Sequence, residues 1–219
     1  MVYEGVDAVT RASLEATEES IRGQRAFDVK VHDDASSLRE AMADRLFDDI
    51  TKSLAEKQRC TLIVPVGPIG QYELLAARCL EESVSLKNVV FIIMDEYLDS
   101  DNSHIDADDP LSFRGHMKRN LLDLLPESLR PTVIVPDPTD LSVIPALIEQ
   151  RGLDFTYAGV GITGHLAFND PVPGRDDPEW FAGVGTRIVQ LSPETRLINS
   201  VTAAMGNTLR VPLMAVTVG

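Results

Sequence analysis

Short hydrophobic runs alternate with longer amphipathic segments along this chain. The runs are rich in Val, Ile and Leu, as strands buried on both faces of a parallel sheet are. The segments between them repeat apolar positions every three or four residues, as helices that cover a sheet do. The pattern predicts an α/β fold with a mostly parallel sheet and helices on both of its faces. We expect strands at residues 27–31, 61–66, 88–94, 132–135, 154–161, 187–191 and 212–218.

The helical segments carry recognisable start signals. The longest repeats its apolar side chains at four-residue steps, namely Leu38, Met42, Leu46, Ile50 and Leu54. Ser36 or Ser37 can cap it, and Ser192 and Pro193 suit the start of the last helix. The other helices are expected at residues 70–82, 111–124, 141–150 and 193–205. The loops left at residues 96–110 and 169–185 are long, and long loops in compact domains commonly bind ligands.

Length and composition describe an ordinary globular protein. The chain has 219 residues, 44% of them hydrophobic and 25% charged, which predicts a single domain over residues 1–219. It has no apolar run long enough for a membrane span and no signal-peptide pattern at its start, so we expect a cytoplasmic protein. Cys60 and Cys79 lack metal-binding or secretory spacing and are expected to be buried thiols.

The net charge restricts the partners. A formal charge of −14 argues against nucleic acid and against anionic membrane surfaces, both of which need a basic footprint. The same charge raises a difficulty for a phosphorylated small-molecule substrate, which would need a local positive clamp set against the overall field.

Polar residues gather where the expected strands end. Ligands of parallel α/β sheets bind outside the carboxyl ends of the strands. Asp95 and Glu96 directly follow one buried run, so Asp95 could accept a proton there, although a solvated turn is the alternative. Seven carboxylates and no Lys or Arg lie between Asp95 and Asp109, and their repulsion could raise some pKa values. The segment lacks the spacing of a calcium loop, and no metal site is expected.

Two glycine-containing turns follow other strands. Gly67 and Gly70 could let backbone amides approach an anion at a helix start, although a plain strand-to-helix turn is the favoured interpretation of this segment. Gly161 and Gly164 bracket a turn that presents His165, and Asp170 lies five residues further on. A nearby carboxylate can fix the tautomer of a histidine and raise its basicity, which favours a catalytic role for His165.

Five segments in this order resemble the glucosamine-6-phosphate deaminase/isomerase family. They are VPVGPIGQY, MDEY, GVGITGHLAFNDP, TRIVQLSPETRLINS and VPLMAVTVG. The related 6-phosphogluconolactonases resemble the chain less, because they usually carry Arg where Tyr97 stands. The resemblance implies a modified Rossmann-like sheet and a reaction without a cofactor. In that reaction the ring of an amino-sugar phosphate opens, a proton moves between C2 and C1, and ammonia is released.

The resemblance also implies roles for individual residues. Asp95 would move the C2 proton, His165 would open the ring, and Asp170 would orient His165 from a position where the family usually has Glu. The residues implied to bind the substrate are Gly67, Pro68, Glu96, Gly161, Thr163, Gly164 and Arg187. Family members are often oligomers, so a homo-oligomer is expected.

Several family features are changed in this chain. Thr163 replaces an Asp, Val201 replaces an Arg, and P-V-G-P replaces the phosphate loop P-T-G-S-T-P. The sequence also ends at TVG, where the family typically continues with another strand and helix. Arg175, Arg187 and Arg196 are the cations that could replace the altered phosphate ligands. Two alternatives therefore stay open, namely a non-catalytic sugar-binding or regulatory protein, and a 6-phosphogluconolactonase-like hydrolase in which His165 activates water.

Overall fold

The computed structural model describes residues 15–17, 19–20, 23, 28–172, 174–175 and 177–219. The chain divides into two compact units, residues 1–38 and 39–219. In the first, the Asp34 carboxylate accepts from the Ser37 amide at 2.8 Å, so Asp34 caps the long helix in place of Ser36 or Ser37. Residues 28–31 are not strand, and residue 27 lies outside the described residues. The larger unit holds every strand that the structure describes, and a single domain over residues 1–219 stays a prediction.

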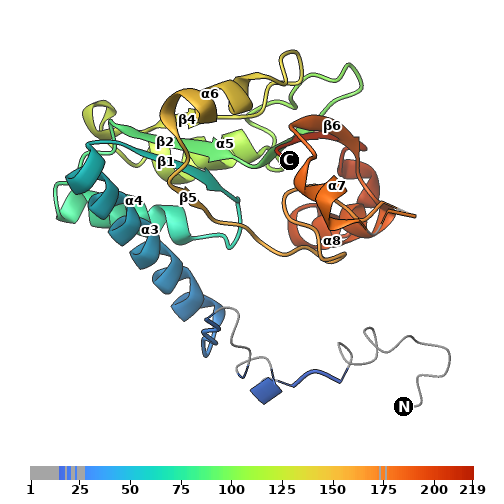
Figure 1. The fold of residues 1–219 in the computed structure, drawn as a ribbon, viewed down its shortest axis with the longest axis horizontal. Coiled ribbons are helices and arrows are strands. Elements are labelled where there is room, and N and C mark those ends of the chain that lie inside the picture. Colours follow the sequence, from blue (N-terminus) through green and yellow to red (C-terminus); the bar gives the residue numbers. More distant parts are fainter. Residues whose placement is uncertain (1–14, 18, 21–22, 24–27, 173, 176) are drawn as a thin grey trace. The chain divides into compact units, whose positions relative to one another are not determined.

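Four parallel strands form the main sheet of the larger unit. They are β1 (Cys60–Val64), β2 (Val89–Ile93), β4 (Thr132–Ile134) and β5 (Phe155–Thr156), in the order β4-β2-β1-β5. The helices α3 (Ala35–Lys57) and α4 (Gln71–Glu81) lie over one face of this sheet, and α6 (Val143–Arg151) lies over the other (Figure 1). Leu46, Ile50 and Leu75 pack on the first face, and Ile144 packs on the second. The predicted sheet with helices on both faces is confirmed.

A second, antiparallel sheet adjoins the first. It contains β3 (Asp95–Leu98), β7 (Met214–Thr217) and β6 (Arg187–Gln190), in that order. The prediction that residues 187–191 and 212–218 join the parallel sheet is wrong, because both strands pair antiparallel in this second sheet. Residues 96–98 of β3 were assigned to a loop, since a short charged segment gives no strand signal without its distant partner β7. The Met94 amide donates to Val64 and its carbonyl accepts from Val218, so the two sheets meet at this residue.

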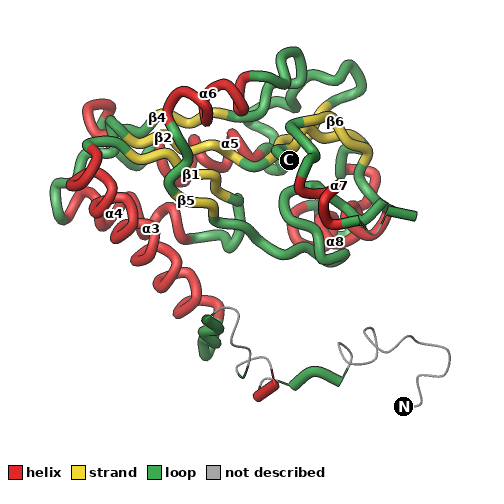
Figure 2. Tube along the Cα trace, viewed as in Figure 1, coloured by secondary structure: helices red, strands yellow, loops and turns green. Residues whose placement is uncertain are grey.

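Shorter helices complete the fold. The expected helix at residues 111–124 is α5 (Phe113–Met117) continued by a π-helical turn (Lys118–Leu122). Further along are a 3-10 turn (Glu127–Leu129), α7 (Pro178–Ala182), α8 (Pro193–Ala203) and a second 3-10 turn (Thr208–Arg210). Ser192 accepts from the Thr195 amide and caps α8, as predicted. The described chain between β5 and α7 is loop with one isolated bridge between Val160 and Leu166 (Figure 2).

Two further sequence expectations concern the core and the membrane. Cys60 and Cys79 are fully buried free thiols, as predicted. Among the described residues, no helix combines the length and the apolar character that a membrane span requires.

Candidate active site

A cleft of about 450 Å³ opens where β1 and β2 of the parallel sheet end. Three segments contribute most of its wall, and these are the turn after β1, the start of β3 and the glycine-rich loop of residues 159–170. Helix α8 closes one side. The lining residues are Pro65, Val66, Gly67, Pro68, Ile69, Met94, Asp95, Phe113, Gly159, Val160, Gly161, His165, Ala167, Phe168, Asn199, Thr202 and Ala203. The cleft thus lies at the edge of the sheet where parallel α/β folds bind ligands.

Asp95 is the buried acid of this cleft. It is the first residue of β3 and is only 9% exposed. Burial raises the pKa of its carboxyl group to about 8, with a smaller contribution from the charge of Glu96. No other described residue forms a hydrogen bond with this carboxyl group. An acid with a pKa near neutrality can both accept and return a proton, which suits acid–base chemistry.

Glu96, by contrast, does not line the cleft. Its carboxylate is fully buried and accepts hydrogen bonds from the Ser112 hydroxyl and from the amides of Tyr97, Phe113 and Arg114, at 2.8–3.1 Å. These amides include the first ones of α5, so Glu96 stabilises the start of that helix. The substrate-binding role expected for Glu96 does not fit this structure, because its oxygens are already occupied.

The glycine-rich loop places His165 in the cleft wall. The Gly161 amide donates to the His165 carbonyl at 2.9 Å, and the Gly164 amide donates to Gly161 at 2.9 Å. A Cβ atom on Gly161 would lie 2.0 Å from Nε2 of His165, so only glycine allows the ring this position. Gly164 has a φ of 82°, which also favours glycine. Gly161 and His165 line the cleft, whereas Thr163 and Gly164 do not.

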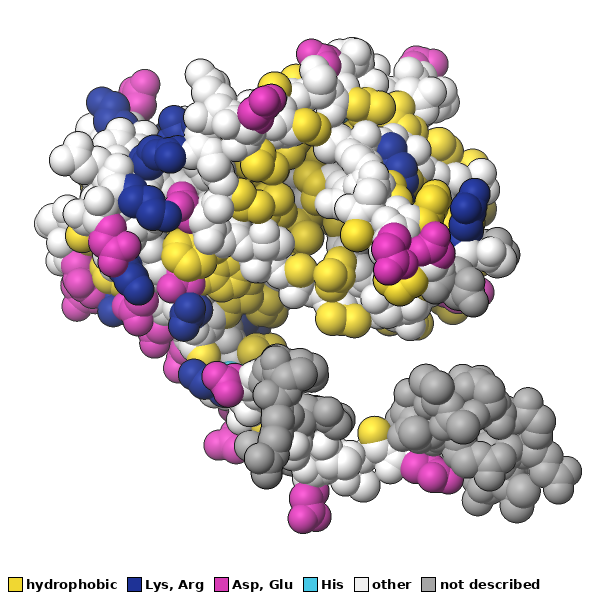
Figure 3. Space-filling model, in the orientation of Figure 1, with side chains coloured by type: hydrophobic (Ala, Val, Ile, Leu, Met, Phe, Trp, Pro, Cys, Tyr) yellow, Lys and Arg dark blue, Asp and Glu magenta, His cyan; other side chains and the backbone are white. Residues whose placement is uncertain are grey.

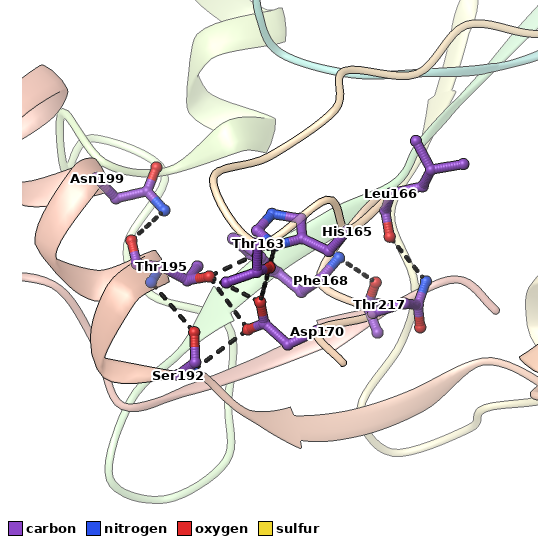
Figure 4. A network of polar contacts seen from close by, with 10 residues as sticks. Thr163, His165, Leu166, Phe168, Asp170, Ser192, Thr195, Asn199 and Thr217 are labelled. Atoms are coloured by element: carbon purple, nitrogen blue, oxygen red, sulfur yellow. Dashed lines mark hydrogen bonds and ion pairs between the residues drawn. The ribbon is translucent and has the colours of Figure 1, made fainter. Parts of the chain in front are cut away.

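A polar network behind His165 fixes the orientation of its ring (Figure 4). Nδ1 of His165 lies 2.8 Å from Oδ1 of Asp170. The hydroxyls of Thr163 and Thr195 donate to the Asp170 carboxylate at 2.6 Å and 3.0 Å, and the Ser192 amide donates at 3.3 Å. Burial alone would raise the pKa of Asp170, but the hydrogen bonds from Thr163, Thr195 and Ser192 outweigh it and hold the pKa below its usual value. An ionised Asp170 selects the tautomer with hydrogen on Nδ1, which leaves Nε2 to exchange a proton.

Thr195 and Ser192 belong to this network, although the sequence did not indicate either as a site residue; Ser192 was expected only as a helix cap. The less expected of the two is Thr195. It is fully buried in the first turn of α8, 25 residues after Asp170. From the sequence it had only the features of a polar helix start, because no local spacing links it to His165. Thr163 in turn holds Asp170 directly, although it cannot supply the carboxylate that the family usually has there.

The turn after β1 supplies the opposite wall. Gly67 and Pro68, joined by a cis peptide bond, both line the cleft. The Gln71 side chain donates to the Val66 carbonyl at 2.9 Å, and the Tyr72 hydroxyl donates to Pro65. Gly70 caps α4 with a φ of 115°, and a Cβ there would lie 2.8 Å from Cδ of Arg39. The turn is thus held by its own helix and offers the cleft mainly backbone and apolar surface.

Arg187 lies outside the cleft. It lines a separate hollow of about 360 Å³ together with Asp170 and Trp180. Burial lowers the pKa of its guanidinium group. The structure thus separates Arg187 from Asp95 and His165, with which the resemblance had grouped it. Among the described residues, no group of His, Cys, Asp or Glu side chains is arranged to hold a metal ion.

The chain is similar in sequence to glucosamine-6-phosphate deaminases. The protein of that name from Porphyromonas gingivalis strain ATCC 33277 is 29% identical over 200 residues, which cover 86% of this chain and 70% of the relative. The one from Mycoplasmopsis pulmonis is 27% identical, with 88% and 72% covered. No protein-family model matches the chain.

Solved structures share its fold. A monomeric glucosamine-6-phosphate deaminase of the NagB superfamily superposes with a TM-score of 0.67 at 23% identity, covering 85% of this chain and 73% of that one. A 6-phosphogluconolactonase from Shewanella baltica superposes with a TM-score of 0.57 at 17% identity, with 86% and 72% covered. The predicted α/β architecture is that of these proteins.

Proposed function

We infer that this chain, whose sequence resembles glucosamine-6-phosphate deaminases, is an enzyme that converts an amino-sugar aldose into a ketose and releases ammonia. The curated relatives are named glucosamine-6-phosphate deaminase, which supports the release of ammonia from an amino-sugar phosphate. The observation that carries the proposal is the placement of Asp95 and His165 in the wall of one cleft. Two proton-transfer groups with different surroundings can serve different steps of such a reaction.

Ring opening requires a proton to leave the C1 hydroxyl and another to reach the ring oxygen. We assign this exchange to Nε2 of His165, since Asp170 holds Nδ1. The resulting open chain has a C1 aldehyde, which acidifies the hydrogen on C2. The same imidazole can take one proton and deliver the other, so no external acid is required.

The isomerisation then moves the C2 hydrogen to C1. We assign it to the carboxylate of Asp95, which accepts the proton and returns it to the neighbouring carbon. Its raised pKa, about 8, makes the carboxylate a stronger base than an exposed aspartate and its acid form a proton donor near neutral pH. During this shift the C1 oxygen gains a proton and the C2 nitrogen loses one, so the product is an imine at C2 with a C1 hydroxyl. Addition of water to the imine followed by loss of ammonia gives the ketose.

A second candidate function follows from the 6-phosphogluconolactonase among the proteins that share the fold. In a lactonase, Nε2 of His165 would activate water to attack an ester carbonyl. This reaction needs no proton transfer at C2, so the lactonase hypothesis assigns no essential role to Asp95. A binding protein without catalysis would show no turnover, whether or not Asp95 and His165 were substituted.

The decisive test is ammonia and ketose formation from glucosamine and from glucosamine-6-phosphate. Asp95→Asn and His165→Ala should each lower turnover by roughly 10²–10⁴-fold, the usual contribution of a general acid or base. Asp101→Asn, which changes an exposed carboxylate of the same segment, should retain wild-type turnover. Hydrolysis of 6-phosphogluconolactone that survives Asp95→Asn would replace the proposal with the lactonase function. Absence of turnover on all three compounds would leave a binding role.

A further inference from the structure

We propose that the side-chain oxygen of Asn199 recognises the amino group on C2 of the substrate, which makes Asn199 a specificity-determining residue. The inference rests on the proposed function and deepens it. Asn199 lies on α8 and lines the same cleft as Asp95 and His165. Asp95 acts on the hydrogen of C2 in the proposed reaction, so a side chain that binds the nitrogen on C2 has to line the cleft that contains Asp95.

A hydrogen bond fixes which way the Asn199 side chain faces. Its Nδ2 donates to the Thr195 carbonyl at 2.9 Å. Only the nitrogen of a carboxamide can donate, so the oxygen must occupy the other position of the group. Figure 4 shows this oxygen turned away from the Thr195 carbonyl. Among the described residues none donates to it, and Asn199 is partly exposed. Oδ1 of Asn199 can therefore accept a hydrogen bond from a ligand in the cleft.

Thr202 adds a second acceptor to the same wall. It follows Asn199 by three residues, a spacing that places both side chains on one face of a helix, and both line the cleft. The Thr202 hydroxyl donates to the carbonyls of Ile198 and Asn199, at 3.1 Å and 3.3 Å. Because its hydrogen is engaged within the helix, the hydroxyl oxygen is left to accept. These two side chains thus present acceptor oxygens to a ligand, while their donor hydrogens are already bonded within α8.

An ammonium group fits such acceptors better than a hydroxyl does. It has three donor hydrogens and no acceptor, whereas a hydroxyl both donates and accepts. The surroundings of the acceptors are largely apolar. Ile69 and Val160, which also line the cleft, are 60% and 76% exposed, and hydrophobic side chains occupy the middle of the larger unit on the face drawn in Figure 3. An apolar environment strengthens a hydrogen bond to a charged group, so the contact with Asn199 should discriminate strongly.

The bound ammonium also acts on the proposed base. Burial raises the pKa of Asp95 to about 8, so the free cleft holds much of this acid in its protonated form at neutral pH. A nearby cation favours the carboxylate, which is the form that accepts the C2 proton. By holding the amino group in the cleft, Asn199 lets the substrate ionise the base that will act on it. A sugar with a hydroxyl on C2 brings no such cation.

Calorimetry with two alditol phosphates tests the inference without turnover. The ligands 2-amino-2-deoxyglucitol 6-phosphate and glucitol 6-phosphate cannot form a C1 aldehyde, so neither is isomerised, and they differ only at C2. We expect the wild type to bind the amino compound more tightly by roughly tenfold or more, and Asn199→Leu to lower this preference by about tenfold, since a hydrogen bond to a charged group commonly contributes that much.

Asn199→Asp separates recognition of the ligand from support of the helix. It retains an acceptor oxygen but loses the donor to the Thr195 carbonyl, so it should keep the preference for the amino compound. Glu194→Gln, an exposed position on the same helix, should leave the preference unchanged. Loss of the preference in Asn199→Asp as well as in Asn199→Leu would show that Asn199 only supports the turn of α8, and would overturn the inference.

Failure of this inference and failure of the proposed function give different results. Equal binding of the two alditols by the wild type, binding of neither, or an undiminished preference in Asn199→Leu would each overturn the inference. Ammonia release from glucosamine-6-phosphate alongside any of these results would leave the proposed function intact. Absence of turnover, together with a preference that depends on Asn199, would refute the proposed function and still support recognition of the amino group.

Discussion

At the scale of single residues, Asp95 combines a function with a cost to stability. Its pKa in the folded protein is about 8, above the ordinary value of 3.8. Folding therefore favours the protonated form. The contribution of the protonated Asp95 to the free energy of unfolding is fully present at pH values below 3.8. It is lost as the pH rises through about 8.

Asp95→Asn should consequently stabilise the protein at high pH while it removes activity. The amide mimics the protonated acid, so the unfolding free energy of the variant should exceed that of the wild type by on the order of a few kcal/mol at pH 8. The difference should shrink toward zero near pH 4. Urea unfolding of both proteins at the two pH values measures it, and a difference that is the same at both would contradict the assigned pKa.

The residue scale also shows what the sequence could reveal about the site. His165 and Asp170 were recognisable because they lie five residues apart, within one glycine-rich segment. Thr195 was not, because its contact with Asp170 exists only once α8 packs against the loop. The resemblance implied a substrate-binding role for Glu96 as well as a catalytic role for Asp95, yet adjacent residues of a strand point to opposite faces.

At the scale of elements, Glu96 couples β3 to the start of α5. Its carboxylate accepts four hydrogen bonds, including two from the amides of Phe113 and Arg114. Glu96→Gln keeps the shape but loses the charge and turns one acceptor into a donor that faces other donors. We expect the unfolding free energy to fall by about 1–3 kcal/mol, as for a buried charged hydrogen-bond partner.

Chemical denaturation of Glu96→Gln beside Glu127→Gln measures this effect. Glu127 is exposed at the start of a 3-10 turn, so its substitution should change little. Equal stabilities of the two variants would show that Glu96 does not support the helix.

The sequence predicted the position of some strands correctly but not the sheet to which every strand belongs. β1, β2 and β4 were predicted well, since continuous apolar runs are typical of buried parallel strands. β6 and β7 were recognised as strands but placed in the wrong sheet. Hydrophobicity shows that a strand is buried, whereas its direction and partners depend on the path of the chain between elements.

At the scale of the whole molecule, β7 links distant parts of the site. It pairs with β3, which begins at Asp95. The Thr217 hydroxyl accepts from the Phe168 amide at 3.1 Å, and the Val218 carbonyl accepts from the Asn169 side chain at 3.0 Å. β7 and the residue that follows it therefore support both β3, which carries the proposed base, and the loop that carries His165.

Thr217→Val should loosen this link with little change in volume. We expect kcat to fall by roughly tenfold or more, because small displacements of reacting groups are costly in rate. Thr217→Ser retains the hydroxyl and should remain close to wild type. Ammonia-release kinetics of the two variants make the comparison, and equal kcat values would rule out a positioning role for the hydroxyl.

The alternation of Asp95 and Glu96 along β3 has one more consequence. One carboxylate lines the cleft and the other anchors α5, and the register of β3 on β7, in which Asp95 pairs with Thr217, decides which acid takes which side. A slip of one residue in this pairing would exchange the two acids between opposite faces of the strand. Deleting a single residue between β2 and β3 would therefore threaten the base and the helix anchor together, although it would remove neither side chain.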